Sequence, residues 1–308
     1  MLHLAIVVTS VPDERLLFPS DTRGAFDLLP GPWRVDQRWL GEGEAWEAQI
    51  LVPDEAAGRE ALRIVRERLA GRRVDINVVP AGRARRKRLL VADMESTIVE
   101  QEFIDELAEI ASERLAVSAI TERAMRGEID FATSFTSRLL RLRGVSLDDM
   151  AHVWLSRASY MPGAEVLVAT MRRHGAYAAL VTSGFSYFAR RVALALEFDT
   201  WEANFPTVMA AKLDGGHRGR IVGPAEKAQA LLTLTAERGL DARDTLAVGD
   251  GANDVAMIRA AGLGVAFRAK PVLREAAAAL PTGAVITHGD LTALLYLQGY
   301  RREEFARV

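Results

Sequence analysis

From Leu89 onward, short apolar runs alternate with helical segments, and this alternation constrains the fold more than any other feature of the 308-residue chain. The runs are nearly continuous, as in strands that are buried on both faces of a parallel sheet. They are Leu89–Ala92, Ala178–Val181, Thr245–Val248, Gly264–Ala266 and Ala284–Ile286. The helical segments between them are Gly163–His174, Gly184–Ala195, Pro224–Arg238 and Val255–Ala261. Strand–helix alternation predicts a doubly wound α/β sheet with right-handed crossovers.

A helical insertion follows the first of these strands. Its predicted helices are Glu102–Leu115, Ser118–Arg126, Phe131–Arg143 and Leu147–Ser156. Sites in doubly wound sheets lie at the carboxyl ends of the strands, so an insertion at this point predicts a cap over the site. We therefore expect residues 83–99 and 160–308 to form the core and residues 100–159 to form a small helical cap.

Residues 1–82 have a different pattern and predict a separate α+β domain. Strands are expected at Leu4–Thr9, Trp33–Leu40, Ala45–Val52 and Val74–Val79, with a helix that begins near Asp54. The stretch between Thr9 and Trp33 gives no clear assignment. The order resembles a βαββαβ ferredoxin-like module with a degraded first helix, and is similar to the small-molecule-binding ACT domains. Such a module suggests regulation, or a homodimer formed through this domain.

The basic segment Gly82–Arg88 joins the two parts and carries five basic residues. It has two interpretations, a nucleic-acid-binding arm or a solvated linker. No aromatic residues interleave with the basic ones, and the net charge of the chain is −2. Both observations favour the solvated linker.

Composition excludes several kinds of site and partner. The absence of cysteine excludes disulfides, thiolate metal sites and a cysteine nucleophile. The N-terminus lacks the basic region and cleavage site of a signal peptide, and no apolar run would span a bilayer. We therefore expect a cytoplasmic protein with no nucleic-acid or membrane partner. Of the 39 basic residues only four are lysines, namely Lys87, Lys212, Lys227 and Lys270, so a lysine at a strand or helix terminus stands out.

Polar groups follow the predicted strands where a parallel sheet would form its site. Asp93 and Glu95 follow the first strand, and the sequence Thr182-Ser183-Gly184 ends the second. Such a turn offers a hydroxyl and backbone N–H groups to an anion. Lys227 lies near the start of a helix, and the acidic, glycine-rich turn 249–254 follows a later strand. Carboxylates in such a turn suit a hard cation such as Mg²⁺.

Together these segments resemble the haloacid dehalogenase (HAD) superfamily of phosphatases, and more narrowly its phosphoserine-specific branch. The resemblance covers about Leu89 to Leu297, and the most specific match is Gly249-Asp250-Gly251-Ala252-Asn253-Asp254. It implies that Asp93 is the nucleophile, forming an aspartyl-phosphate. It also implies that Mg²⁺ is held by Asp93, Asp250, Asp254 and the backbone carbonyl of Glu95. Lys227 and Thr182 would stabilise the transferring phosphoryl group, together with Asn253 and the turn at Ser183 and Gly184.

The resemblance also suggests how a substrate would be chosen. Glu102 matches a glutamate that binds the substrate ammonium group, and Arg138 matches an arginine that binds its carboxylate. Met125 and Phe131 match apolar residues that close over the substrate. Each has a purely structural alternative, because Glu102 could cap its helix and the two apolar residues could pack the cap.

Two positions depart from the family pattern. Glu95 stands where aspartate is usual, at the position of the acid that protonates the leaving alkoxide and then activates water. The extra methylene adds about 1.5 Å of reach, and displacements of about 1 Å can cost roughly 10²-fold in rate. Thr182 replaces the usual serine but keeps the hydroxyl.

The implied activity is Mg²⁺-dependent hydrolysis of O-phospho-L-serine to L-serine and phosphate, the last step of serine biosynthesis. Two alternatives remain open. The same site could act on another small phosphomonoester or transfer the phosphoryl group to another hydroxyl. The chain could also be a catalytically weak regulatory protein that binds an amino acid.

Overall fold

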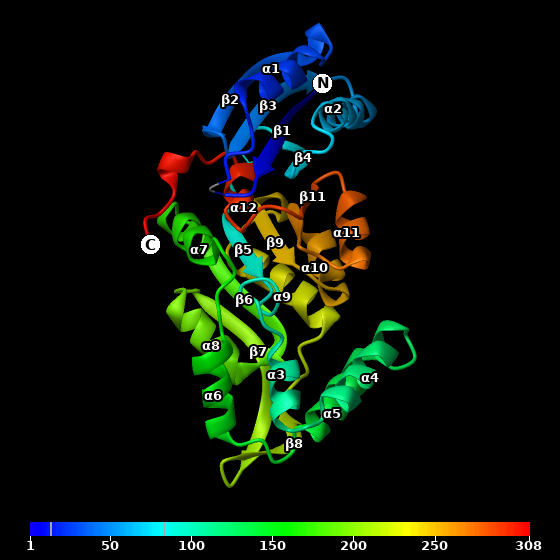
Figure 1. Cartoon of the computed structure of the whole chain (residues 1–308), viewed down its shortest axis with the longest axis vertical. Helices are drawn as coiled ribbons and strands as arrows, with labels where there is room; N and C mark the ends of the chain where they lie inside the picture. Colours follow the sequence, from blue (N-terminus) through cyan, green and yellow to red (C-terminus); the bar gives the residue numbers. More distant parts are fainter. Residues whose placement is uncertain (13, 83) are drawn as a thin grey trace.

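The computed structural model describes residues 1–12, 14–82 and 84–308, and shows an elongated molecule (Figure 1). The N-terminal module lies at one end, the α/β core in the middle and the helical insertion at the other end. In this part of the chain no helix combines the length and the apolar character needed to cross a membrane.

The N-terminal module is a four-stranded antiparallel sheet with two helices. Its elements are β1 (Leu2–Ser10), α1 (Pro19–Asp27), β2 (Arg34–Gly41), β3 (Ala45–Val52), α2 (Glu55–Arg68) and β4 (Val74–Pro80). The strand order β2-β3-β1-β4 confirms the predicted ferredoxin-like module. Asp54 begins α2, because its side chain accepts a hydrogen bond from Ala57 N at 2.9 Å. The first helix is short but present, in the stretch that the sequence left unassigned.

The core is a seven-stranded sheet in the order β11-β10-β9-β5-β6-β7-β8. Its strands are β5 (Leu89–Ala92), β6 (Tyr177–Phe185), β7 (Thr200–Met209), β8 (Lys212–Arg218), β9 (Thr245–Gly249), β10 (Leu263–Phe267) and β11 (Gly283–Ile286). The five predicted strands are confirmed as a parallel set with β5 between β6 and β9. The sequence did not predict β7, which continues the parallel set, or β8, which pairs antiparallel with β7.

Helices cover both faces of this sheet, as expected for a doubly wound fold. They are α7 (Ala164–Arg173), α8 (Ser186–Ala195), α9 (Pro224–Glu237), α10 (Val255–Ala260), α11 (Pro271–Ala278) and α12 (Ala293–Leu297). Leu90 and Ala92 of β5 belong to the apolar cluster of α7, α8 and α12, while Leu89 and Val91 belong to that of α9, α10 and α11. Alternate residues of β5 thus point to opposite faces, and both faces are buried.

The insertion after β5 is helical, as predicted. It contains α3 (Phe103–Ile110), α4 (Arg114–Met125), α5 (Phe131–Arg141) and α6 (Leu147–Arg157). The prediction of a single helix over Glu102–Leu115 is wrong, because the helix is interrupted between α3 and α4. Ser112 adopts a φ of 58° there, a left-handed conformation that does not continue a right-handed helix.

The basic segment before β5 corrects the prediction of a solvated linker. The Arg85 guanidinium is buried, forms an ion pair with Glu47 of β3 at 2.5 Å, and donates to Leu297 O at 2.9 Å. Lys87 is also buried, and its Nζ donates to Ala84 O and Arg243 O at 2.9 and 2.7 Å. Arg83, which belongs to the same predicted segment, lies outside the described residues. At least two of the basic side chains are therefore buried, and that of Arg85 joins the module to the core.

Polar side chains of β4 make further contacts across this boundary. The Asn77 carboxamide accepts from Val285 N and donates to Val285 O, both at 2.9 Å. The Asp75 carboxylate accepts from the backbone N–H groups of Thr287, His288 and Gly289. Several apolar residues of the module also belong to the main core cluster, namely Ala5, Val7, Leu40, Ala45 and Val79. The module is thus packed against the core rather than tethered to it.

Candidate active site

The predicted polar groups meet at the carboxyl ends of three adjacent strands. Asp93 directly follows β5, Thr182 lies in the last part of β6, and Asp250 directly follows β9. Because β5 pairs in parallel with both neighbours, these three ends lie at one edge of the sheet. This edge is where ligands bind in doubly wound sheets.

Lys227 connects two of the carboxylates. Its side chain is fully buried, and Nζ lies 2.6 Å from Asp93 Oδ1 and 2.8 Å from Asp254 Oδ1. Burial by itself lowers the pKa of Lys227, but the charges of Asp254 and Asp93 outweigh it and hold the pKa above its usual value. The lysine is therefore a fixed positive charge beside Asp93.

Asp254 is fully buried and organises the turn as well as the lysine. Its Oδ2 accepts from Asp250 N at 3.2 Å and from Gly251 N at 3.1 Å, while Oδ1 accepts from Lys227. The carboxylate fits because position 249 is glycine, where a Cβ would lie 2.7 Å from Asp254 Cβ. Since both oxygens already accept hydrogen bonds, the geometry favours a positioning role for Asp254.

Asp93, Asp250 and Asp254 form an acidic cluster. One carboxylate oxygen from each lies within 4.8 Å of the others, and all three residues are buried. Burial, followed by the charge of Asp254, raises the pKa of Asp93, and Lys227 only partly opposes this. Three clustered carboxylates, two of them paired with Lys227, have the oxygen donors and the excess negative charge that suit a divalent cation such as Mg²⁺. The Glu95 carboxylate is not part of this cluster.

Glu95 lies instead against the end of β6. Its Oε1 accepts from Phe103 N at 3.0 Å, at the start of α3. A Cβ at position 184 would lie 2.8 Å from Glu95 Cδ and closer still to Oε2, so the carboxylate occupies space that only glycine leaves open. Burial, and then the charges of Glu102 and Asp93, raise the pKa of Glu95 well above its usual value. A carboxyl group with a raised pKa is suited to donate a proton near neutral pH.

The last residues of β6, where the sequence predicted a turn, present hydroxyl groups near the same edge. Thr182 Oγ1 accepts from Gly184 N at 2.9 Å. Ser183 Oγ is buried and has no hydrogen-bond partner among the described residues, so it retains a donor for a ligand. The Asn204 carboxamide donates to Ser183 O at 2.8 Å and accepts from Val222 N at 2.7 Å. Asn204 thereby connects the end of β6 to the segment that precedes α9.

Glu102 and Arg138, the predicted specificity residues, carry opposite charges. Glu102 Oε1 accepts from Ser96 Oγ at 2.9 Å and makes no side-chain cap to α3. This removes the helix-capping alternative. Arg138 extends from α5, is partly buried, and makes one long hydrogen bond, to Ser134 O at 3.4 Å. Burial lowers its pKa, while the charges of Glu95, Asp105 and Glu102 oppose that shift. Among the described residues Arg138 has no ion-pair partner, in contrast to Arg141 on the same helix, which lies 3.6 Å from Glu113.

The two apolar residues expected to close over the substrate differ in environment. Phe131 is partly buried and packs against Gly223, where a Cβ would lie 2.8 Å from the ring. It therefore contacts the start of α9, the helix that carries Lys227. Met125, at the end of α4, is 73% exposed. Most of the Met125 side chain thus faces solvent in this conformation, and its predicted role stays a prediction. Asn253, which lies in the acidic turn, is partly buried.

Two residues of this region were not predicted. Lys270 Nζ lies 3.2 Å from Asp250 Oδ2 and 3.9 Å from Glu102 Oε1, so it adds a second lysine to the edge of the acidic cluster. The scarcity of lysine and the position of Lys270 after an apolar strand could have identified it. Nothing in the sequence around Asn204 distinguishes it, because it lies in an unpredicted strand.

Two relatives with similar sequences are both described as phosphoserine phosphatases. The chain is 41% identical over 225 residues to "Phosphoserine phosphatase" of Archaeoglobus fulgidus, a match that covers 73% of this chain and 64% of that protein. It is 39% identical over 267 residues to "Phosphoserine phosphatase SerB2" of Mycobacterium tuberculosis, covering 84% of this chain and 62% of that protein. The chain thus spans less than two thirds of the length of these relatives.

Solved structures extend the similarity to the N-terminal module. A probable phosphoserine phosphatase from Vibrio cholerae, in unliganded form, superposes with a TM-score of 0.74 at 27% identity, covering 98% of this chain and 88% of that chain. A phospho-aspartyl intermediate analogue of phosphoserine phosphatase superposes with a TM-score of 0.62 at 32% identity, covering 68% of this chain and 98% of that one. The profile of haloacid dehalogenase-like hydrolases matches residues 90–259, more than half of the chain, which holds Asp93, Lys227 and the acidic turn. The chain therefore belongs to the haloacid dehalogenase-like hydrolase family.

Proposed function

We propose that this protein is a Mg²⁺-dependent phosphatase that hydrolyses O-phospho-L-serine to L-serine and phosphate. The observation that carries the proposal is the buried Lys227 ammonium, 2.6 Å from Asp93, at the carboxyl edge of the sheet. A carboxylate held beside a permanent positive charge is suited to attack a phosphoryl group whose negative charge the lysine offsets. Relatives described as phosphoserine phosphatases at 39–41% identity support the same reaction.

In the proposed reaction, an Asp93 oxygen attacks phosphorus and the bond from phosphorus to the serine oxygen breaks. Glu95 donates a proton to that oxygen, and its raised pKa favours the protonated form that this step needs. Glu95 then accepts a proton from the water that attacks the aspartyl-phosphate, which releases phosphate and restores Asp93. Lys227, Thr182, Ser183 and the backbone at Gly184 would hold the phosphoryl oxygens, and Asn253 would contact them from the acidic turn.

Mg²⁺ would be held by Asp93, Asp250 and the backbone carbonyl of Glu95, and would supply positive charge to the phosphoryl oxygens. Asp254, which already accepts three hydrogen bonds, would act by positioning Lys227 and the turn.

For the amino-acid part of the substrate, we assign the ammonium group to Glu102 and the carboxylate to Arg138. The absence of an ion-pair partner for Arg138 among the described residues supports this, because its guanidinium fork is free to bind a carboxylate through two hydrogen bonds. Phe131 and Met125 would cover the substrate from the cap. The proposal includes a small-molecule substrate and, as the sequence suggested, a cytoplasmic location.

A panel of phosphomonoesters tests the substrate. Phosphate release is measured with O-phospho-L-serine, O-phospho-L-threonine and p-nitrophenyl phosphate, with and without Mg²⁺, for the native protein and for the Arg138→Ala and Arg141→Ala variants. We expect Arg138→Ala to lower kcat/KM for phosphoserine at least about tenfold more than for p-nitrophenyl phosphate, which has no carboxylate. Arg141→Ala, on the exposed side of the same helix, should leave both unchanged.

Equal losses on both substrates would show that Arg138 is structural or contacts the phosphate. A preference for another phosphomonoester would overturn the assigned substrate and retain the site. No phosphate release from any substrate would support the alternative of a regulatory protein that binds an amino acid.

A further inference from the structure

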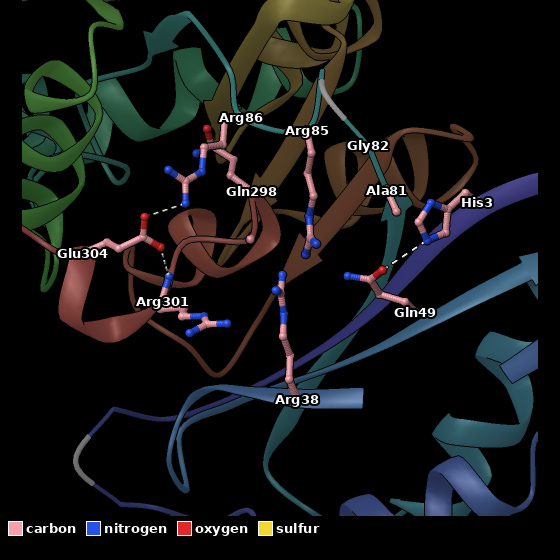
Figure 2. Close-up of a pocket in the computed structure, with 11 residues that line it drawn as sticks. His3, Arg38, Gln49, Ala81, Gly82, Arg85, Arg86, Gln298, Arg301 and Glu304 are labelled. Carbon is pink, nitrogen blue, oxygen red and sulfur yellow. Dashed lines mark hydrogen bonds and ion pairs between the residues drawn. The ribbon is translucent and has the colours of Figure 1, made fainter. Parts of the chain in front are cut away.

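A cavity with a volume of about 450 Å³ lies between the N-terminal module and the core (Figure 2). Its walls come from three parts of the chain: strands of the module, the segment that leads into β5, and the C-terminal segment after α12. Four arginines line it, Arg38, Arg85, Arg86 and Arg301. Figure 2 shows the ends of Arg38 and Arg85 pointing toward one another across the cavity.

Among the described residues, the carboxylates that pair with these arginines are fewer than the arginines themselves. Glu47 is shared by two of them, at 3.0 Å from Arg38 and 2.5 Å from Arg85. Glu304 pairs with Arg86 at 2.6 Å, and the Arg86 guanidinium also lies over the Tyr300 ring at 4.1 Å. Within the described part of the chain, the acidic partner of the Arg301 side chain is Glu303, at a distance of 3.9 Å. Among the described residues, the cavity therefore has an excess of positive charge.

The excess of positive charge is least favourable at Arg85, which is buried, whereas the other three arginines are partly exposed. Burial lowers the pKa of Arg85, and the charges of Arg38 and Arg86 lower it further, against the opposing effect of Glu47. Positive groups confined at short range repel one another, and a bound anion would relieve that repulsion. Guanidinium groups are the side chains best suited to hold carboxylates and phosphates through paired hydrogen bonds.

This cavity is separate from the candidate active site. Arg85 and Arg86 precede β5, whereas Asp93 follows it, so the two sites lie at opposite ends of that strand. None of the four arginines contacts the acidic turn or Lys227 among the interactions of the described residues.

We propose that this cavity is a binding site for a small organic anion that carries two or more carboxylate or phosphate groups. One acidic group would contact Arg38 and Arg85, and another would contact Arg301. The volume lies within the range of about 300–1,000 Å³ that is usual for organic ligands. Because the lining comes from both the module and the core, the bound anion would hold the two together. The site is independent of the proposed phosphatase reaction.

Calorimetric titration tests the site with citrate as the carboxylate probe and pyrophosphate as the phosphate probe, on metal-free full-length protein at constant ionic strength. We expect one probe or both to bind at one site per chain. The Arg301→Gln variant should weaken that binding at least about tenfold, the effect of losing one charge-assisted contact. Arg38→Gln provides a second, independent test, and Arg59→Gln is the matched control, because Arg59 is an exposed arginine of the module outside the cavity.

Binding by citrate alone or pyrophosphate alone identifies the acidic group that the site prefers. The proposal is overturned if neither probe binds at millimolar concentration, or if Arg301→Gln and Arg38→Gln bind as tightly as Arg59→Gln. The latter result would place the probes at the active site or at dispersed surface charges. Arg301→Gln should also abolish the rise in melting temperature that the bound probe produces.

Discussion

The fit of Glu95 beside Gly184 yields a prediction about the departure from the family pattern. Glutamate is one methylene longer than the usual aspartate, and the structure accommodates its carboxylate where a Cβ at position 184 would lie 2.8 Å from Glu95 Cδ. Ordinary contact between carbon atoms begins at about 3.5 Å. The Gly184→Ala substitution should therefore displace the carboxylate by roughly 0.7–1 Å.

A displacement of that size predicts a loss of about 10²-fold in kcat, or about 2.7 kcal/mol of transition-state stabilisation. The upper limit is the complete loss of proton transfer, about 10²–10⁴-fold, which Glu95→Gln should approach because glutamine keeps the size but cannot exchange the proton. Phosphate release from phosphoserine under saturating substrate measures both variants. Circular dichroism confirms that each is folded.

A double substitution separates the clash from other effects of alanine. Glu95→Asp alone should stay within about tenfold of the native rate, because aspartate is the residue usual in the family at this position and keeps the carboxylate that exchanges the proton. In that background the clash is relieved, so adding Gly184→Ala should cost little further. Native activity in Gly184→Ala would refute the positioning of Glu95, and a full loss in the double variant would mean that alanine blocks the substrate instead.

Three further predictions follow from the site and the domain boundary. Asp93→Asn should abolish phosphate release without unfolding the protein, and more than a few percent of residual activity would exclude the covalent route. Chelation of divalent cations should remove activity that Mg²⁺ restores, and Asp250→Asn should raise the Mg²⁺ concentration needed for half-maximal rate. Removal of residues 1–82 should lower the melting temperature or prevent folding, because it leaves the buried Arg85 without Glu47, a change that costs about 3–5 kcal/mol in comparable buried pairs. A stable, active truncated protein would show that the core folds without the module.

The sequence predicted the parts of the fold whose residues are buried on both sides. The parallel strands read as continuous apolar runs because helices cover both faces of the sheet. Strand β7 gave no such pattern, since it combines a buried Asn204 with Pro206 and exposed residues near its end. It pairs with β8 in a hairpin of residues close in sequence, such as Met209 with Lys212, but only Leu213 of β8 is buried, so no apolar pattern marks this strand.

The candidate site likewise contains some residues that the sequence could identify and others that it could not. Asp93, Thr182 and Asp250 could be identified because strand topology alone brings strand ends together. Asn204 reaches this region through tertiary packing, which no local pattern encodes, whereas the position of Lys270 after an apolar strand could have identified it. The basic segment Gly82–Arg88 was wrongly predicted to be a solvated linker for a related reason. Composition indicates that Arg85 and Lys87 are charged, but only the folded partners Glu47 and Arg243 determine that they are buried.

The contact between Asn77 and Val285 has a consequence for how the module protects the core. Strands β4 and β11 are each at an edge of their sheets, and open edges can pair with other chains. The Asn77 carboxamide satisfies the outward-facing peptide groups of Val285 as a neighbouring strand would, yet the two sheets stay separate. Undocking of the module would expose that edge to water and to strand addition. The amide hydrogen of Val285 should therefore exchange with solvent deuterium at a rate set by module opening, which makes this single amide a reporter of docking.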